Sequence, residues 1–226
     1  PTIYEDRELL IVDKPAGLAV HSGTGISAGL IEILRSVRKE LTYLELIHRL
    51  DRGTSGVLLL AKNRKSLISL HEQFRGREIR KIYTLLVHGS WIKKIQSVSL
   101  KLQTSYRMNG ERHVIVSDSG TETQTELRLT KRYENYSLIE AVPDTGKTHQ
   151  IRVHVAHLGF PIVGDDRYGR DIQDKQKKEN PPKRMFLHAK KLSFLHPISR
   201  QNLTIEANVP KDFQLFIEQM HEGGSN

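Results

Sequence analysis

Residues 48–52, His-Arg-Leu-Asp-Arg, place a single carboxylate, Asp51, between two arginines. The stretch continues into the turn-forming residues 53–56 and then into the apolar run 57–61, so Asp51 stands close to an expected buried strand. Charged groups near a core must be paired or hydrogen-bonded, and a carboxylate held beside cations can act as a nucleophile or a general base. The alternative is an Asp that caps the turn, with both arginines in solvent, because Asp is common in turns. The stretch alone leaves both interpretations open.

Three histidines, at positions 149, 154 and 157, raise the question of a metal site. His154 and His157 are three residues apart and could share one face of a helix, whereas His149 would fall elsewhere. No acidic residue lies within this expected helix to complete a hydrolytic zinc site. The pattern therefore favours ordinary surface or hydrogen-bonding histidines over metal ligands.

Other familiar reactive motifs do not fit the sequence. The chain has no cysteine, which excludes disulfides, thiolate metal sites and a Cys nucleophile. Ser55 lies two residues after Gly53 but only one before Gly56, and a strand follows, so it does not form a nucleophile elbow. The glycines never take the spacing of a Walker loop or a dinucleotide fingerprint. No cofactor is therefore expected.

The composition is typical of a protein that binds polyanions. The 226 residues include 35 Lys and Arg against 26 Asp and Glu, a net charge of +9. Such a field attracts RNA, DNA or an anionic membrane, although a lysine-rich surface alone would give the same charge. No apolar run approaches the ~20 residues that span a bilayer, and no secretory signal is recognisable, so we expect a cytoplasmic protein. The chain begins with Pro1 rather than Met, and we expect it to be a piece of a longer protein.

Hydrophobic periodicity predicts a few helices among many strands. The expected helices cover residues 30–37, 66–75, 148–158 and 212–220. The expected strands cover residues 8–13, 57–62, 81–87, 98–102, 113–117, 123–130, 136–142, 186–194 and 203–209. Residues 170–184 are charged and contain prolines, as in a surface loop. The pattern predicts one α+β domain over residues 1–226, with a mixed, largely antiparallel sheet flanked by helices.

The motif around Asp51 is one of five blocks spread along the chain. The other four are Asp13-Lys14-Pro15-Ala16-Gly17-Leu18, Lys81-Ile82-Tyr83, Gly146-Lys147-Thr148-His149-Gln150-Ile151-Arg152-Val153-His154 and Gly164-Asp165-Asp166-Arg167-Tyr168-Gly169. In this order the blocks resemble the RluA-type pseudouridine synthases, and within them the RluC branch, which modifies large-subunit ribosomal RNA. Five separated blocks in the right order are more specific than any one of them.

The resemblance implies a role for each matching residue. Asp51 matches the family's essential aspartate, and Tyr83 matches the tyrosine that lies against the target base. Arg152 matches the basic residue that pairs with the catalytic carboxylate, and Arg49 matches the arginine that helps to displace the uridine. Position 53 is Gly, where relatives usually carry a larger residue, and this could alter the loop after Asp51.

The implied reaction suits the composition. Pseudouridine formation breaks the N–C1′ bond, turns the uracil and joins C5 to C1′, without any redox change or group donor. A carboxylate can act as nucleophile or base and can stabilise positive charge at the sugar. The target base must leave the stack first, and an aromatic ring offers it a stacking face. Basic side chains would hold the RNA phosphates; the expected RNA-binding residues are Arg49, Arg52, Lys62 and Lys147.

Two other functions are alternatives to pseudouridine formation. A non-catalytic RNA-binding or ribosome assembly module would not need a carboxylate facing a polyanion. A glycosidase usually needs two carboxylates that work as a pair, and Asp165 and Asp166, adjacent in a Gly-rich turn, look structural. The resemblance also implies an S4-type RNA-binding domain upstream, absent from this piece. We expect a monomer that acts on large-subunit ribosomal RNA, with no membrane partner.

Overall fold

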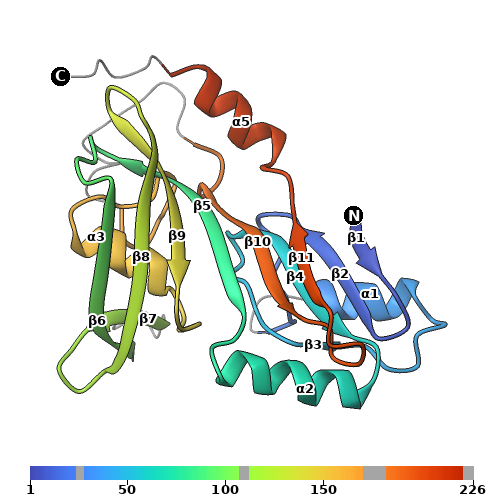
Figure 1. The fold of residues 1–226 in the computed structure, drawn as a ribbon. Coiled ribbons are helices and arrows are strands. Elements are labelled where there is room, and N and C mark those ends of the chain that lie inside the picture. Colours follow the sequence, from blue (N-terminus) through green and yellow to red (C-terminus); the bar gives the residue numbers. More distant parts are fainter. Residues whose placement is uncertain (24–27, 107–111, 170–181, 221–226) are drawn as a thin grey trace. The chain divides into compact units, whose positions relative to one another are not determined.

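The computed structural model describes residues 1–23, 28–106, 112–169 and 182–220 (Figure 1). The chain forms two compact units. Unit 1 comprises Pro1–Lys81 and His188–Val209, and unit 2 comprises Ile82–Leu187 and Pro210–Asn226. Most of the charged loop expected over residues 170–184 lies outside the described ranges.

The central strand of unit 1 is β4 (Ser55–Ala61), all seven residues of which are buried. On one side β4 pairs antiparallel with β2 (Leu9–Lys14), and β2 pairs with β1 (Thr2–Glu5). On its other side β4 pairs antiparallel with the short β3 (Glu45–Leu46). The apolar run after Asp51 is therefore a fully enclosed strand, as its composition predicts.

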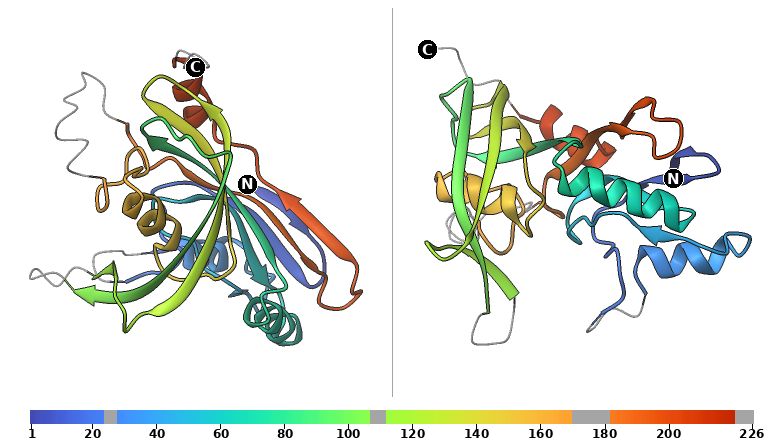
Figure 2. Two further views of the ribbon diagram at one scale, coloured as in Figure 1. Left: turned by 60° about the vertical axis from the view of Figure 1, so that its left-hand side comes forward. Right: turned by 60° about the horizontal axis from the view of Figure 1, so that its bottom comes forward.

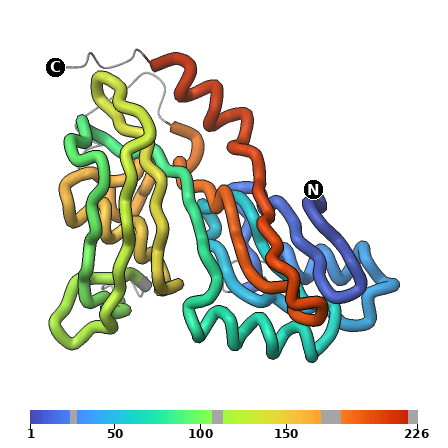
Figure 3. The backbone as a smooth tube through the Cα atoms, in the orientation of Figure 1, coloured from blue at the N-terminus to red at the C-terminus, as the bar shows by residue number. Residues whose placement is uncertain are grey.

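The second segment of unit 1 returns from far along the chain to complete this sheet (Figure 3). Strand β10 (Leu187–Leu195) runs parallel to β4 where His188 lies opposite Ser55, and β11 (Asn202–Glu206) pairs antiparallel with β10. The start of β4, which follows the Asp51 motif, is thus held by a strand more than a hundred residues away in sequence.

Two helices belong to unit 1. Helix α1 (Leu30–Val37) buries Leu30 and Ile31. Helix α2 (Arg64–Arg75) begins after Asn63, whose side chain accepts a hydrogen bond from the Ser66 N–H at 2.9 Å, a typical helix N-cap. Leu70 of α2 packs into the same apolar cluster as residues of β2, β4, β10 and β11.

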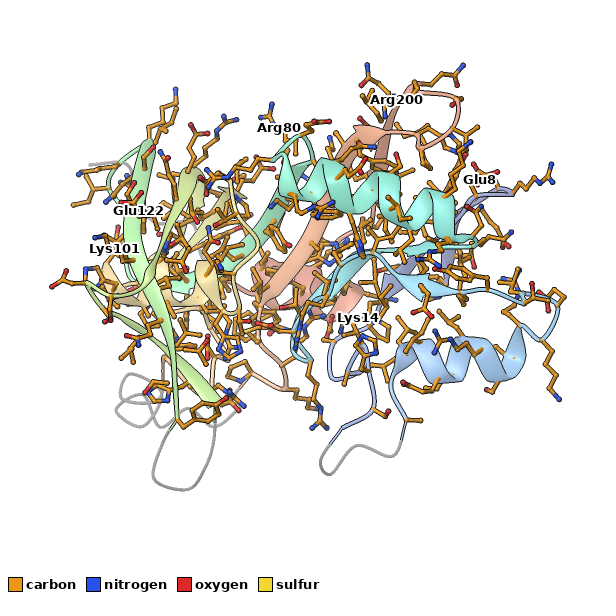
Figure 4. The ribbon with its side chains drawn as sticks, turned by 90° about the horizontal axis from the view of Figure 1, so that it is seen from below. Glu8, Lys14, Arg80, Lys101, Glu122 and Arg200 are labelled. Atoms are coloured by element: carbon orange, nitrogen blue, oxygen red, sulfur yellow. The ribbon has the colours of Figure 1, made fainter. Side chains whose placement is uncertain are left out.

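Unit 2 is built on an antiparallel sheet with the strand order β5-β9-β8-β6-β7. Its strands are β5 (Arg80–His88), β6 (Ile95–Tyr106), β7 (Arg112–Val116), β8 (Thr121–Arg132) and β9 (Tyr136–Pro143). Figure 2 shows β6 and β8 as long, curved strands. Lys101 of β6 lies opposite Glu122 of β8, and both are labelled in Figure 4.

Helix α3 (Gln150–His157) packs on the sheet of unit 2, where Ile151 and Val155 join an apolar cluster with Leu85 and Ile139. The chain leaves this helix through Gly159, which has a φ of 85°, a backbone conformation that glycine adopts without strain. Helix α5 (Lys211–Glu218) packs through Phe213 and Phe216, whose rings lie 4.8 and 4.6 Å from that of Phe186.

The α+β fold with a mixed, largely antiparallel sheet is confirmed, and every helix and strand expected from the sequence is present. Strands β6 and β8 each extend over 12 residues, further than predicted. Their sequences mix exposed polar positions with buried ones, so the apolar pattern marks only part of each strand. Strands β1 and β3 were missed because they are short and only partly buried. None of the described helices is long and apolar enough to cross a membrane.

Candidate active site

Asp51 lies in a loop of unit 1, residues 47–54, between β3 and β4. It is half-buried, and its backbone carbonyl accepts a hydrogen bond from the Thr54 N–H at 3.0 Å. This bond closes a tight turn over Arg52 and Gly53 through the backbone, so the turn does not require the carboxylate of Asp51. The geometry therefore weakens the interpretation of Asp51 as a turn cap.

A buried lysine fastens this turn to the loop after β2. Lys14, labelled in Figure 4, is fully buried, and its Nζ donates to the carbonyls of Pro15 at 2.8 Å, Leu18 at 2.7 Å and Arg52 at 3.3 Å. A buried ammonium needs such partners, because burial without them costs several kcal/mol. The three bonds give a physical reason for the lysine of the motif at residues 13–18.

Gly17 and Arg52 join the same two loops directly. The Gly17 N–H donates to the Arg52 carbonyl at 2.8 Å, and Nε of Arg52 donates to the Gly17 carbonyl at 2.9 Å. Gly17 has a φ of 86°, which favours glycine at this position. Arg52, expected to bind RNA, thus also has a structural contact within unit 1.

The residues after Asp51 are fixed by β10. Nε2 of the buried His188 lies 3.1 Å from the Ala207 carbonyl and must carry the proton that this bond needs, so Nδ1 accepts from the Ser55 hydroxyl at 2.9 Å. Gly56 has a φ of 113°, and a Cβ there would lie 2.2 Å from the Ala189 carbonyl oxygen. Close strand contact explains both the serine and the glycine of the Thr54-Ser55-Gly56 sequence.

His48 fixes the other end of the Asp51 loop. Its Nε2 accepts a hydrogen bond from the Leu59 N–H at 3.1 Å, and its ring stacks on Phe74 with 5.2 Å between the ring centres. Burial, together with the charge of Lys81, lowers the pKa of His48 to about 4. The ring is therefore neutral near pH 7, as an acceptor at Nε2 must be. Asp51 is held between two anchored ends of its loop.

Tyr83 belongs to unit 2. It lies on β5 opposite Ala141 of β9, is half-buried, and packs against the apolar cluster of that unit. Part of its ring therefore has the core role that an isolated strand tyrosine suggests. Because its burial is only partial, some of the side chain stays accessible.

Arg152 lies in the first turn of α3 and is 5% exposed, so its guanidinium is a buried cation rather than a surface one. Its Nε donates to Oδ2 of Asp165 at 2.7 Å and its Nη2 donates to Oδ1 at 2.8 Å. Burial raises the pKa of the Asp165 carboxyl, but the hydrogen bonds and charge of Arg152 outweigh this effect and hold the pKa below its ordinary value. Sequence reasoning treated Asp165 as structural and missed this pairing.

The histidines of α3 differ from one another. His154 is fully buried and its Nε2 lies 2.9 Å from Oγ1 of Thr123, whereas His157 is exposed. His149 has a φ of 56° and its Nδ1 lies 2.8 Å from the Tyr168 hydroxyl. Within the described part of the chain, no group of three or more His, Asp or Glu residues could hold a metal ion.

The remaining expected RNA-binding residues differ in how their charges are used. Arg49 is exposed on the Asp51 loop. Nζ of Lys62 donates to Oε1 of Glu5 at 2.9 Å and to the Asp6 carbonyl at 2.5 Å, so its charge is partly balanced within unit 1. Lys147 is exposed in unit 2 and lines an open pocket of ≈ 380 Å³ between the ends of β6 and β7, the turn at 119–121 and residues 146–148.

Comparison with known proteins matches the chain to one family along most of its length. Residues 8–157 match the RNA pseudouridylate synthase family. The chain is 47% identical over 213 residues to the ribosomal large subunit pseudouridine synthase C of Yersinia pestis, covering 94% of this chain and 66% of that protein. The protein of the same name from Escherichia coli is 44% identical over 220 residues, covering 96% of this chain and 69% of that protein.

The chain thus spans about two thirds of the length of these relatives. Among solved structures, human RNA pseudouridylate synthase domain containing 4 has a TM-score of 0.74 at 23% identity, covering 99% of this chain and 94% of that one. Human RNA pseudouridylate synthase domain containing 1 has a TM-score of 0.75 at 22% identity, covering 99% and 96%. The fold is therefore that of these proteins, and the sequence match extends it to the family: the chain belongs to the RNA pseudouridylate synthases.

Proposed function

We propose that this protein converts uridine to pseudouridine in large-subunit ribosomal RNA, with Asp51 as the catalytic carboxylate. The observation that carries the proposal is the anchored loop around Asp51, which lies within the matched part of the chain. His48, Lys14 and Ser55 hold the backbone on every side of Asp51. The relatives named as ribosomal large subunit pseudouridine synthase C supply the substrate class.

The reaction is an isomerisation in which every heavy atom stays with the substrate and one proton is lost and one gained. The bond from N1 of the uracil to C1′ breaks, the base turns, and a bond from C5 to C1′ forms, after which C5 loses its proton and N1 gains one. A carboxylate can stabilise the positive charge that develops at C1′ or form a bond to the substrate, and it can move the C5 proton. Pre-positioning such a group lowers the barrier because no reorganisation is then needed.

The other site residues take the roles of the matching motif positions. Tyr83 provides the surface against which the displaced base lies, since aromatic rings stack on unpaired bases. Arg152 is the cation that balances the carboxylate, and Arg49 enters the RNA where the uridine has left. Arg52, Lys62 and Lys147 bind phosphates; Arg52 and Lys147 are exposed, whereas Lys62 is partly buried.

The division of these residues between the two units leads to a further part of the proposal. Asp51 and Arg49 belong to unit 1, whereas Tyr83, Arg152 and Lys147 belong to unit 2. We propose that both units are required for activity and act as one catalytic domain, as a monomer and without a cofactor. A substrate in ribosomal RNA would place the protein in the cytoplasm.

The test compares wild-type protein with Asp51→Asn on unmodified 23S ribosomal RNA, using site-by-site pseudouridine mapping. The wild-type protein should form pseudouridine, and Asp51→Asn should form none while its RNA dissociation constant stays within about threefold. Asp118→Asn, at an exposed position in unit 2, is the matched control and should retain full activity. RNA binding by the wild-type protein without product would favour a binding module, release of free uracil would favour a glycosidase, and turnover by Asp51→Asn would contradict the role of Asp51.

A further inference from the structure

The block from Gly164 to Gly169 is the one motif to which the proposed reaction gives no role. It lies in unit 2, after α3, and it carries Asp165, the partner of Arg152. Its spacing brings one carboxylate into a fully buried position while the next residue, Asp166, stays 83% exposed at its side chain. The two adjacent aspartates therefore have different surroundings.

The turn is shaped so that Asp165 points inward. Gly164 has a φ of 79°, and a Cβ there would lie 2.0 Å from the Arg184 carbonyl oxygen, so only glycine fits. Oδ1 of Asp165 also accepts the N–H of Arg167 at 3.0 Å and of Tyr168 at 3.2 Å. These bonds lock the carboxylate to its own turn, so its position does not depend on Arg152.

The guanidinium of Arg152 is held in two directions. The bidentate bond to Asp165 fixes its plane, at 2.7 and 2.8 Å. The ring of Tyr168 lies 5.1 Å from the guanidinium carbon, within the range of a cation–π contact. The Tyr168 hydroxyl in turn accepts from the Val114 N–H at 3.0 Å and is hydrogen-bonded to Nδ1 of His149 at 2.8 Å, and the two bonds immobilise the ring.

Stability alone does not account for this arrangement. A cation in the first turn of a helix is disfavoured by the helix dipole, and the first turn of α3 carries no acidic residue. A buried ion pair is often no more stabilising than apolar side chains of the same volume. The pair is better explained by the need for a guanidinium at one fixed place. Asp165 bonds the Nε–Nη2 edge, and this bidentate bond fixes the plane and direction of the whole guanidinium, the Nη1 edge included.

We infer that Asp165 is a positioning residue of the isomerisation. It holds Arg152, with Tyr168 as a second support, so that the guanidinium balances the catalytic carboxylate in a single orientation. This inference rests on the proposed function, because it assigns Asp165 to a reaction that the proposal names. It gives the Gly164–Gly169 motif a purpose, in which the glycines shape the turn and Asp165 and Tyr168 fix the cation.

The test measures single-turnover rate constants on unmodified 23S ribosomal RNA with the enzyme in excess. Asp165→Asn should reduce the rate constant at saturating enzyme at least tenfold, while the RNA dissociation constant changes less than threefold. Asp166→Asn is the matched control, since its carboxylate is exposed and lies 3.8 Å from Nη2 of Arg152; its rate constant should stay within twofold of wild type. A merely structural role would lower the folded fraction but not the rate per folded molecule at saturation.

Folded Asp165→Asn with a wild-type rate constant would overturn the inference. Should this variant fail to fold, Asp165→Glu is measured in its place: it keeps the charge but displaces the guanidinium by one methylene, and an undiminished rate constant there would equally overturn it. A wild-type protein that forms no pseudouridine would contradict the proposed function instead. In that event NMR of the arginine Nε–H groups tests the pairing of Arg152 with Asp165. The Nε proton of Arg152 should exchange slowly with water in wild type and fast in Asp165→Asn.

Discussion

The buried His154 makes the stability of unit 2 depend on pH. Thr123 donates its hydroxyl proton to the Leu100 carbonyl at 2.7 Å, so Nε2 of His154 must be the donor in its bond to Thr123 Oγ1. Nδ1 is buried and has no hydrogen-bond partner among the described residues. A proton on Nδ1 would therefore create a buried cation without an acceptor, and burial lowers the pKa of His154 from 6.5 to about 4.

The sign of the effect follows from proton uptake on unfolding. Below pH 6.5 the unfolded chain binds a proton at His154 that the folded protein does not bind until about pH 4. Stability is therefore lost as the pH falls from 6.5 towards 4. At pH 5 the interval from 6.5 is 1.5 pH units, and at 1.36 kcal/mol per unit the loss is about 2 kcal/mol. His48 contributes a loss of the same sign, because its pKa is also about 4.

Urea unfolding at pH 7.5, 6.5, 5.5 and 5.0 separates these contributions. His154→Gln keeps a donor for Thr123 but cannot titrate, so its unfolding free energy should fall about 2 kcal/mol less than that of wild type between pH 7.5 and 5. His157→Gln, at the exposed histidine one turn along α3, should follow the wild-type curve closely. Parallel curves for wild type and His154→Gln would refute the reasoning, since they would mean that His154 titrates alike in the folded and unfolded states.

Two further predictions concern the anchoring of the Asp51 loop, each measured by urea unfolding at pH 7.5. Gly56→Ala should lower the free energy of unfolding by about 2–5 kcal/mol, because the added Cβ would clash with the Ala189 carbonyl in a backbone conformation unfavourable to alanine. Gly23→Ala is the control: a Cβ there has open space, and its free energy of unfolding should stay close to that of wild type. Lys14→Met should lower the free energy of unfolding by about 2–4 kcal/mol, because it removes the hydrogen bonds of Nζ to the Pro15 and Leu18 carbonyls. A loss no larger than that of Lys101→Met, at an exposed position on β6, would contradict this role.

Local pattern was enough to predict the fold class and all the helices and strands except β1 and β3. The apolar run after Asp51 became the enclosed strand β4, and the helical spacing after residue 148, ended by Gly159, became α3. These predictions succeed because hydrophobic periodicity and turn-forming residues are local features, which can be recognised from a few neighbouring residues. The five motif blocks identified the family in the same way, as short stretches read independently of one another.

The sequence by itself predicted which residues carry chemistry, and only the tertiary structure decided what holds those residues in place. Asp51, Tyr83 and Arg152 stand in recognisable motifs. Their supports do not, because Ser55 and His188 lie 133 residues apart and meet only through the register of two parallel strands. Lys14 reaches Arg52 across 38 residues in the same manner.

Asp165 illustrates the same limit within a motif. Its glycine-rich surroundings indicated a turn, and the structure has one, but nothing in the spacing indicated that the turn directs one of two adjacent carboxylates into the core beside Arg152. Burial and pairing are properties of the folded neighbourhood, set by which elements pack together. The sequence lists the charged groups, and the fold decides which of them are removed from water and with whom.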